Sequence, residues 1–236
     1  SISGGTDIVS CFVLGNIYQP VHIGEIQNKG LALNVDIFND KGKPIKNSKG
    51  ELVCKNPFPS MPIKFWNDKN DKKYKEAYFS RFADTWHHGD FAEIKETGGF
   101  VIHGRSDTTL NPGGVRLGTA EIYSEVEKFK EIKESIVVGQ SWDNDVRVVL
   151  FIVMNSKFYL TEDLLKKIKI QIKKNASPRH VPSKVIVVSD IPRTKSGKIV
   201  ELAVKNTIEG NKIKNKEALA NPKTLEQFNN LKELNY

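Results

Sequence analysis

The chain has 236 residues, of which 39% are hydrophobic and 27% are charged, a balance typical of a globular protein and not of a disordered one. No apolar run approaches the length of a membrane span and no signal peptide opens the sequence, so we expect a cytoplasmic protein without a membrane partner. The net charge of +8 favours an anionic partner, and two cysteines, Cys11 and Cys54, imply neither a disulfide framework nor a zinc cluster.

The first part of the chain is predicted to consist mainly of strands and turns. Tyr74, Tyr78 and Phe82 recur at a spacing of four within residues 71–82, which predicts an amphipathic helix. Asn, Asp, Gly and Pro residues at 39–44 predict a tight turn. Strands are predicted at 31–38, 50–55, 90–94 and 99–104, and the last two are expected to form a β-hairpin.

A glycine-rich loop at 104–118 separates this part from a second one with a different pattern. The elements expected after it are a helix at 120–129, strands at 135–139 and 146–154, a helix at 161–174, a strand at 184–188 and a helix at 198–208. Thr119 is predicted to cap the first helix, with Glu121 near the positive end of its dipole. From about residue 108 we expect a small α+β domain that ends in an irregular polar tail after Gly210.

The basic charge is concentrated toward the end of the sequence. Residues 157–236 contain 17 Lys and Arg against 8 Asp and Glu, whereas the rest of the chain is almost neutral. A nucleic acid, a membrane surface or a phosphate-rich small molecule would each suit this charge. Charge alone does not choose among these partners.

Five short motifs follow one another along the chain. They are "WHHGD" (86–90), "GRSD" (104–107), "NPGGVR" (111–116), "TAEI" (119–122) and "PRTKSGK" (192–198). The first ends in Gly-Asp, which taken alone indicates a turn. His87 and His88 are neighbours, and neighbours on a strand point to opposite faces, so joint metal chelation is not expected. Each motif is weak by itself, but their order is a strong signal.

In this order the motifs resemble those of the acyl-adenylate-forming enzymes, which include acyl-CoA synthetases, adenylation domains and luciferases. The resemblance implies a mixed α/β and α+β fold, with residues 1–107 as the β-rich end of a large AMP-binding domain. Residues 108–236 would form a small mobile α+β lid domain, with a hinge at Asp107. The family's Ser/Thr/Gly-rich phosphate loop does not occur in this sequence, so we expect a preceding part of the same protein to carry it. We also expect the chain to be inactive alone.

The resemblance assigns nucleotide-binding roles to four residues. Asp90 would hold the ribose, because a carboxylate accepts protons from both hydroxyls. Arg105 and Arg116 would face ribose and phosphate oxygens, for which a guanidinium offers fixed donors. In "SGGTD" (3–7), Thr6 would contact the α-phosphate, and Asp7 would replace a glutamate that meets Mg²⁺, directly or through water.

The same resemblance assigns residues to the two chemical steps. Lys198 matches the lysine that the family needs for adenylation, and here it would stabilise charge between the carboxylate and the α-phosphate. After rotation of the lid, Gly113 and Gly114 would line the pantetheine tunnel, and Lys173 would contact phosphates of CoA.

The resemblance further implies ATP, Mg²⁺ and CoA as cosubstrates and acetoacetate as the acid that is activated. Gly4 stands where some relatives have a tryptophan that shortens the acyl pocket, so a larger acid is admitted. Propionate and butyrate remain alternatives, because the rest of the pocket is not in this sequence. A rival hypothesis is a non-enzymatic basic module that binds a polyanion through residues 157–236, but it leaves "GRSD", "GGVR" and "TAEI" without a purpose.

Overall fold

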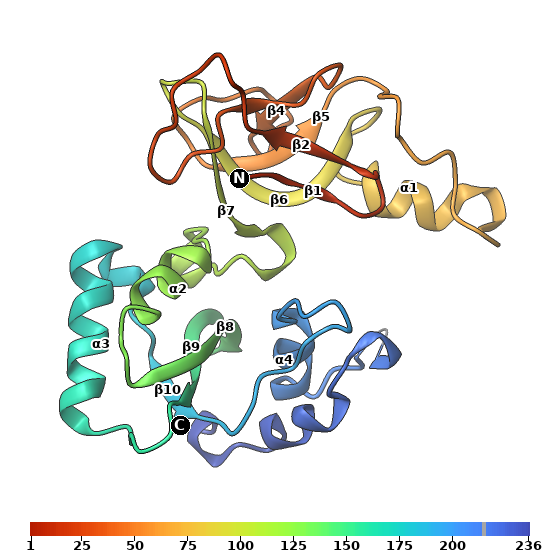
Figure 1. Ribbon diagram of the computed structural model, residues 1–236. Helices are drawn as coiled ribbons and strands as arrows, with labels where there is room; N and C mark the ends of the chain where they lie inside the picture. Colours follow the sequence, from red (N-terminus) through yellow and green to blue (C-terminus); the bar gives the residue numbers. More distant parts are fainter. Residues whose placement is uncertain (214–215) are drawn as a thin grey trace. The chain divides into compact units, whose positions relative to one another are not determined.

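The computed structural model describes residues 1–213 and 216–236 of the chain (Figure 1). The chain divides into two compact units, Ser1–Ser106 and Asp107–Tyr236. Among the described residues, no helix has both the length and the apolar composition that a bilayer crossing requires.

The first unit is built on two antiparallel sheets. One has the strand order β1-β2-β3 and the other β4-β5-β6-β7. Their bounds are β1 Ser3–Gly5, β2 Ser10–Leu14, β3 Asn28–Lys29, β4 Val35–Phe38, β5 Gly50–Cys54, β6 Trp86–Ile94 and β7 Phe100–Arg105. Phe12 of β2, Ile37 of β4 and Leu52 of β5 are fully buried in a common core with Trp86. The hairpin predicted at 90–104 is confirmed as β6 and β7, although β6 begins earlier, at Trp86.

The helix predicted at 71–82 is confirmed in type but is shorter, as α1 Lys72–Tyr78. Tyr78 stacks on Trp86 with ring centroids 3.7 Å apart, so the end of the helix is held against β6. Phe82 lies beyond the helix and packs edge-on against Phe38 in a separate small cluster. Of the three aromatic residues spaced by four, Phe82 is therefore not part of the helix and packs in a different cluster.

The second unit consists of a three-stranded sheet with helices packed against it. Its helices and strands follow one another along the chain in the predicted order. The elements are α2 Ala120–Val126, β8 Ile132–Trp142, β9 Asp145–Met154, α3 Glu162–Asn175, β10 Lys184–Val187 and α4 Glu201–Ile208. β9 lies in the centre, antiparallel to β8 and parallel to β10. Figure 1 shows α3 and α4 on opposite sides of this sheet. Successive residues of β9 alternate between the two cores, with Leu150 on the α3 side and Phe151 on the α4 side, as the two-residue period of a strand requires.

A threonine precedes both α2 and α3, but only the one before α3 makes a capping hydrogen bond with its side chain. Thr161 caps α3, since its hydroxyl accepts a hydrogen bond from the Leu164 amide at 3.2 Å. Thr119 precedes α2 as predicted, but its backbone is already helical and its side chain makes no capping bond, so that part of the prediction is wrong. Glu121 does lie in the first turn of α2, 3.1 Å from His180 Nε2.

The prediction of an irregular polar tail after Gly210 is wrong for the residues that the structure describes. Short 3-10 turns at Lys216–Ala218, Pro222–Phe228 and Lys232–Leu234 fold back onto the sheet. Leu225 and Phe228 are buried in the α4-side core, where the Phe228 ring meets Phe151 edge-on at 5.0 Å. The apolar residues Leu225, Phe228, Leu231 and Leu234 recur at every third residue, which is the period of a 3-10 helix and not of an α-helix or a strand.

Candidate functional site

Asp90 and Arg105 form the centre of the candidate site in the first unit. The register of β6 and β7 places them directly opposite each other, and Arg105 Nη1 lies 3.0 Å from Asp90 Oδ1. The same nitrogen donates to the carbonyl oxygen of His88 at 3.1 Å. Opposite charges at facing strand positions stabilise the pair, and the Asp90 carboxylate is buried while the Arg105 side chain is half exposed.

Gly89 allows the arginine to lie across β6. The motif "WHHGD" was predicted to end in a turn, but Gly89 and Asp90 lie inside β6, so that prediction is wrong. Gly89 has φ of +81°, and a Cβ atom there would lie 2.7 Å from Arg105 Nη2. The left-handed backbone favours glycine at this position, and a side chain there would displace the guanidinium from its present place.

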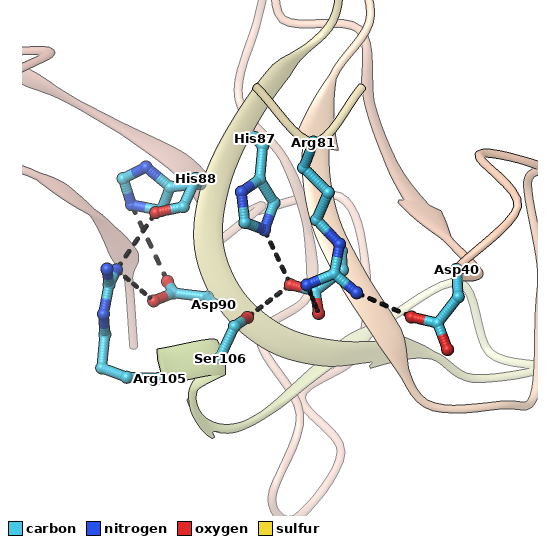
Figure 2. A network of polar contacts seen from close by, with 8 residues as sticks. Asp40, Arg81, His87, His88, Asp90, Arg105 and Ser106 are labelled. Atoms are coloured by element: carbon cyan, nitrogen blue, oxygen red, sulfur yellow. Dashed lines mark hydrogen bonds and ion pairs between the residues drawn. The ribbon is translucent and has the colours of Figure 1, made fainter. Parts of the chain in front are cut away.

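Two further side chains meet the Asp90 carboxylate. The Ser3 hydroxyl donates to Oδ2 at 3.2 Å, which links β1 to β6. His88 Nε2 lies 3.7 Å from the same oxygen, as Figure 2 shows. Burial lowers the pKa of His88, against the opposing effect of Asp90, so the neutral imidazole is favoured near pH 7. A carboxylate with donors on both oxygens and further lone-pair capacity can accept additional hydroxyl protons.

Asp7 lies beside this cluster, in the turn between β1 and β2. The Tyr78 hydroxyl donates to Asp7 Oδ2 at 2.7 Å. Burial first, and then Asp7, raise the pKa of Tyr78, so the phenol stays protonated and remains a donor. Asp7 and the His88 ring both lie against Gly5, so Asp7 is near the imidazole that lies beside Asp90. Thr6 is exposed in the same turn.

Gly5 and Gly4 permit the close packing around that turn. A Cβ at Gly5 would lie 1.9 Å from Asp7 Oδ1 and 3.0 Å from His88 Cε1, so glycine is what lets these groups meet. At Gly4 a Cβ would lie 2.4 Å from the Ser10 carbonyl oxygen of β2. This contact is a reason for glycine that is independent of any acyl pocket.

In the second unit, the glycine pair predicted to bind CoA is held by β9. The Gly113 amide donates to both carboxylate oxygens of Asp145 at 2.9 Å. Gly113 and Gly114 have φ of +59° and +75°, and a Cβ at either would meet open space. Arg116 follows in the same loop and is half buried.

The segment "PRTKSGK" forms a tight turn that presents Lys198 to solvent. The Thr194 amide donates to the Lys198 carbonyl at 2.8 Å, and the Lys198 amide donates to the Thr194 hydroxyl at 3.0 Å. Gly197 has φ of +84°, which favours glycine. Arg193 donates to the Gly197 carbonyl at 3.0 Å and pairs with Glu134 at 2.9 Å, so this arginine holds the turn. Lys198 lies in the turn and not at the start of α4.

The tail residues bind this turn from its other side. Lys195 donates its amide to the Ala218 carbonyl at 3.1 Å, and the Ala220 amide donates to the Arg193 carbonyl at 2.8 Å. The Asn221 side chain accepts from the Arg193 amide at 2.8 Å and donates to Asp190 at 2.7 Å. The position of the Lys198 turn therefore depends on the tail.

The remaining predicted residues lie on separate segments. Lys173 is exposed in the last turn of α3, and Asp107 is the exposed first residue of the second unit. The structure thus joins Asp7, Asp90 and Arg105 in one cluster of the first unit. It places Arg116, Lys173 and Lys198 on three different segments of the second.

Sequence reasoning missed the supporting residues Ser3, Tyr78 and His88. The sequence motifs give Ser3 no role and raise His88 only in connection with metal chelation beside His87, whereas both residues lie against Asp90 in the structure. Tyr78 had a signal, its place in the aromatic spacing of 71–82, but that spacing indicated a core residue and not a partner of Asp7.

The chain is similar to known proteins along almost its whole length. A family profile described as "AMP-binding enzyme C-terminal domain" matches residues 121–198. The "Acetoacetyl-coenzyme A synthetase" of Rhizobium meliloti (strain 1021) is 62% identical over 234 residues, covering 99% of this chain and 36% of that protein. The "Acetoacetyl-CoA synthetase" of Gallus gallus is 49% identical over 236 residues, covering 99% of this chain and 35% of that protein.

A solved structure agrees with these relatives. The "Acetoacetyl-CoA Synthetase from Streptomyces lividans" superposes with a TM-score of 0.90 at 41% identity, covering 96% of this chain and 35% of that one. The chain spans about a third of the length of the curated relatives it matches.

Proposed function

We propose that the protein containing this chain is an ATP-dependent acid–thiol ligase, because residues 121–198 match the profile described as "AMP-binding enzyme C-terminal domain". In the first step acetoacetate and ATP give acetoacetyl-AMP and pyrophosphate. In the second step CoA attacks the adenylate and gives acetoacetyl-CoA and AMP. The observation that carries the proposal is the Asp90–Arg105 pair in the first unit, with Asp7 nearby across Gly5 and His88.

The first unit supplies groups that suit a nucleotide. Asp90 accepts hydrogen bonds from the ribose hydroxyls, and Arg105 holds that carboxylate in place while half of its own side chain is exposed, where a guanidinium suits anionic oxygens. Thr6, exposed in the turn beside Asp7, donates its hydroxyl to the α-phosphate. Neutral His88 packs behind Asp90 and adds no positive charge near pH 7.

Asp7 fits a role as a protein ligand of Mg²⁺. Within the described residues no group of three or more acidic, His or Cys side chains could hold a metal alone. Magnesium in nucleotide-dependent enzymes commonly takes only one or two carboxylates, with phosphates and water completing its shell. Asp7 is exposed and oriented by Tyr78, which suits one such ligand. The ion would neutralise phosphate charge.

The second unit supplies the groups that would alternate between the steps. Lys198 stabilises the charge that develops on the α-phosphate during adenylation, without transferring a proton. Rotation at Asp107 then withdraws it and brings Gly113 and Gly114 to the thiol, where the open space at both glycines leaves room for pantetheine. Arg116 faces a phosphate, and Lys173 contacts the phosphates of CoA.

The remaining part of the same protein is the proposed macromolecular partner of this chain. Several large apolar side chains of the first unit are at least nine-tenths exposed. Such side chains offer apolar surface that another part of the protein could bury. They are Ile17, Ile23, Leu31, Ile63 and Trp66. The chain also covers only about a third of its relatives. We infer that the rest of the protein packs on this surface and supplies the phosphate loop and most of the acyl pocket.

Acid-dependent formation of AMP tests the proposal. The intact gene product and the 236-residue chain are each given ATP, Mg²⁺ and CoA with acetoacetate, acetate, propionate or butyrate. We expect turnover only by the intact protein, with acetoacetate preferred. Preference for propionate or butyrate would change the substrate. No AMP from any acid, together with steeply salt-dependent DNA binding, would overturn the ligase in favour of a polyanion-binding module.

A further inference from the structure

Glu51 is a carboxylate in the interior of the first unit. It lies on β5 and its side chain is fully buried. Burying an ionised carboxylate carries a desolvation penalty that only well-placed partners offset, and an apolar side chain of similar size often serves stability better. A buried charge at this position therefore indicates a specific positional role.

The partners of Glu51 come from different segments. Arg81, which follows α1, places Nη1 3.0 Å from Oε1, and its other terminal nitrogen lies 2.6 Å from Asp40. His87 of β6 places Nε2 2.8 Å from Oε2. The Ser106 hydroxyl donates to the same oxygen. Figure 2 shows the side chains of His87, Arg81 and Ser106 pointing toward one another, and all three contact Glu51.

This network includes the last residue of the first unit. Ser106 is the last residue of the first unit, and Asp107 is the first residue of the second. Arg105, one residue earlier, is bound to Asp90. Two consecutive residues are thus held by two separate carboxylates, and the chain is fixed up to Ser106. The exposed Asp107 comes immediately afterwards.

We propose that Glu51 and Ser106 are positioning residues that anchor the fixed end of the hinge, so that backbone rotation between the two steps begins at Asp107. The inference rests on the proposed function, because the rotation belongs to it. Without the anchor, backbone rotation extends from Asp107 back into β7, and the direction in which the second unit rotates is no longer fixed. Neither residue touches a reacting atom in this account.

Three substitutions in the intact protein test the anchor. Ser106→Ala removes the hydroxyl and Ser106→Thr retains it. Thr97→Ala is the matched control, because Thr97 donates to the Glu25 carboxylate at 2.5 Å in the turn at the other end of β7. Hydrogen exchange of residues 104–109 reports on the anchor without any need for activity. Adenylation without CoA is then compared with complete turnover, which requires rotation in every cycle.

We expect Ser106→Ala to accelerate exchange at 104–109 and to lower complete turnover about tenfold more than adenylation, the scale of a lost hydrogen bond to a charged group. Ser106→Thr should restore both, and Thr97→Ala should change neither. Unchanged exchange in Ser106→Ala, or equal loss in adenylation and turnover, would overturn the anchor. If the wild-type protein activates no acid, the proposed function fails, and the exchange measurement still decides whether Ser106 is anchored.

Discussion

The Phe228→Ala substitution tests whether the tail belongs to the core of the second unit. The Phe228 ring is fully buried and meets Phe151 edge-on at 5.0 Å. Truncating a buried phenylalanine to alanine costs about 3–5 kcal/mol through lost burial and a residual cavity. Whole domains are stable by only about 5–15 kcal/mol, so a large share of the unit's stability would be lost.

Native-state hydrogen exchange of β8 and β9 is the assay for this change. A loss of about 3 kcal/mol lowers amide protection in both strands roughly a hundredfold. Tyr159→Ala is the control in the same unit, because its side chain is 82% exposed and such substitutions stay within about 0.5 kcal/mol. If the two variants lose protection equally, the tail is not part of the core and the reasoning fails.

Three smaller predictions concern individual groups. Burial lowers the pKa of His88 below its usual value of 6.5. As the pH falls below 6.5, the unfolded chain therefore protonates His88 more readily than the folded chain does, and the free energy of unfolding decreases by at most about 1.4 kcal/mol per pH unit. Melting curves of the wild type and His88→Gln between pH 7.5 and 5 should diverge, and parallel curves would contradict this. Tyr78→Phe keeps the ring stacked on Trp86 but removes the hydrogen bond to Asp7. The KM for MgATP should therefore rise about fivefold, the scale of one partly exposed hydrogen bond. An unchanged KM would show that Tyr78 does not support the nucleotide site. Gly197→Ala should cost about 1 kcal/mol in the thermal stability of the second unit, because φ is +84° while the added methyl meets open space; no shift would show that the turn relaxes freely.

The strands and helices followed from the sequence where a periodic pattern was strong. The apolar runs of β8 and β9 and the spacing of Leu164, Ile168 and Ile172 on α3 gave the second unit's order correctly. The packing of the tail was missed because Leu225, Phe228, Leu231 and Leu234 recur at every third residue, a spacing that fits neither an α-helix nor a strand. What they contact lies far away in sequence, on β9 and α4, and no local pattern encodes that contact.

The candidate site shows the same division. Asp90 and Arg105 could be found from motifs, and their pairing is explained by the register of β6 and β7. The burial of Glu51 could not be found in this way, because "GELVCK" indicates a strand whose glutamate could face solvent. Only the convergence of Arg81, His87 and Ser106 from three segments makes a buried carboxylate stable there.

The two half-reactions of Lys198→Ala in the intact protein test the central claim most directly. Pyrophosphate release from ATP and acetoacetate measures adenylation, and acetoacetyl-CoA formation from supplied acetoacetyl-AMP measures the second step. Lys195→Ala is the control, since this exposed lysine lies in the same turn and holds the tail through its backbone amide. We predict that Lys198→Ala abolishes adenylation and retains thioester formation, while Lys195→Ala retains both. Equal loss of the two steps in Lys198→Ala would contradict the account.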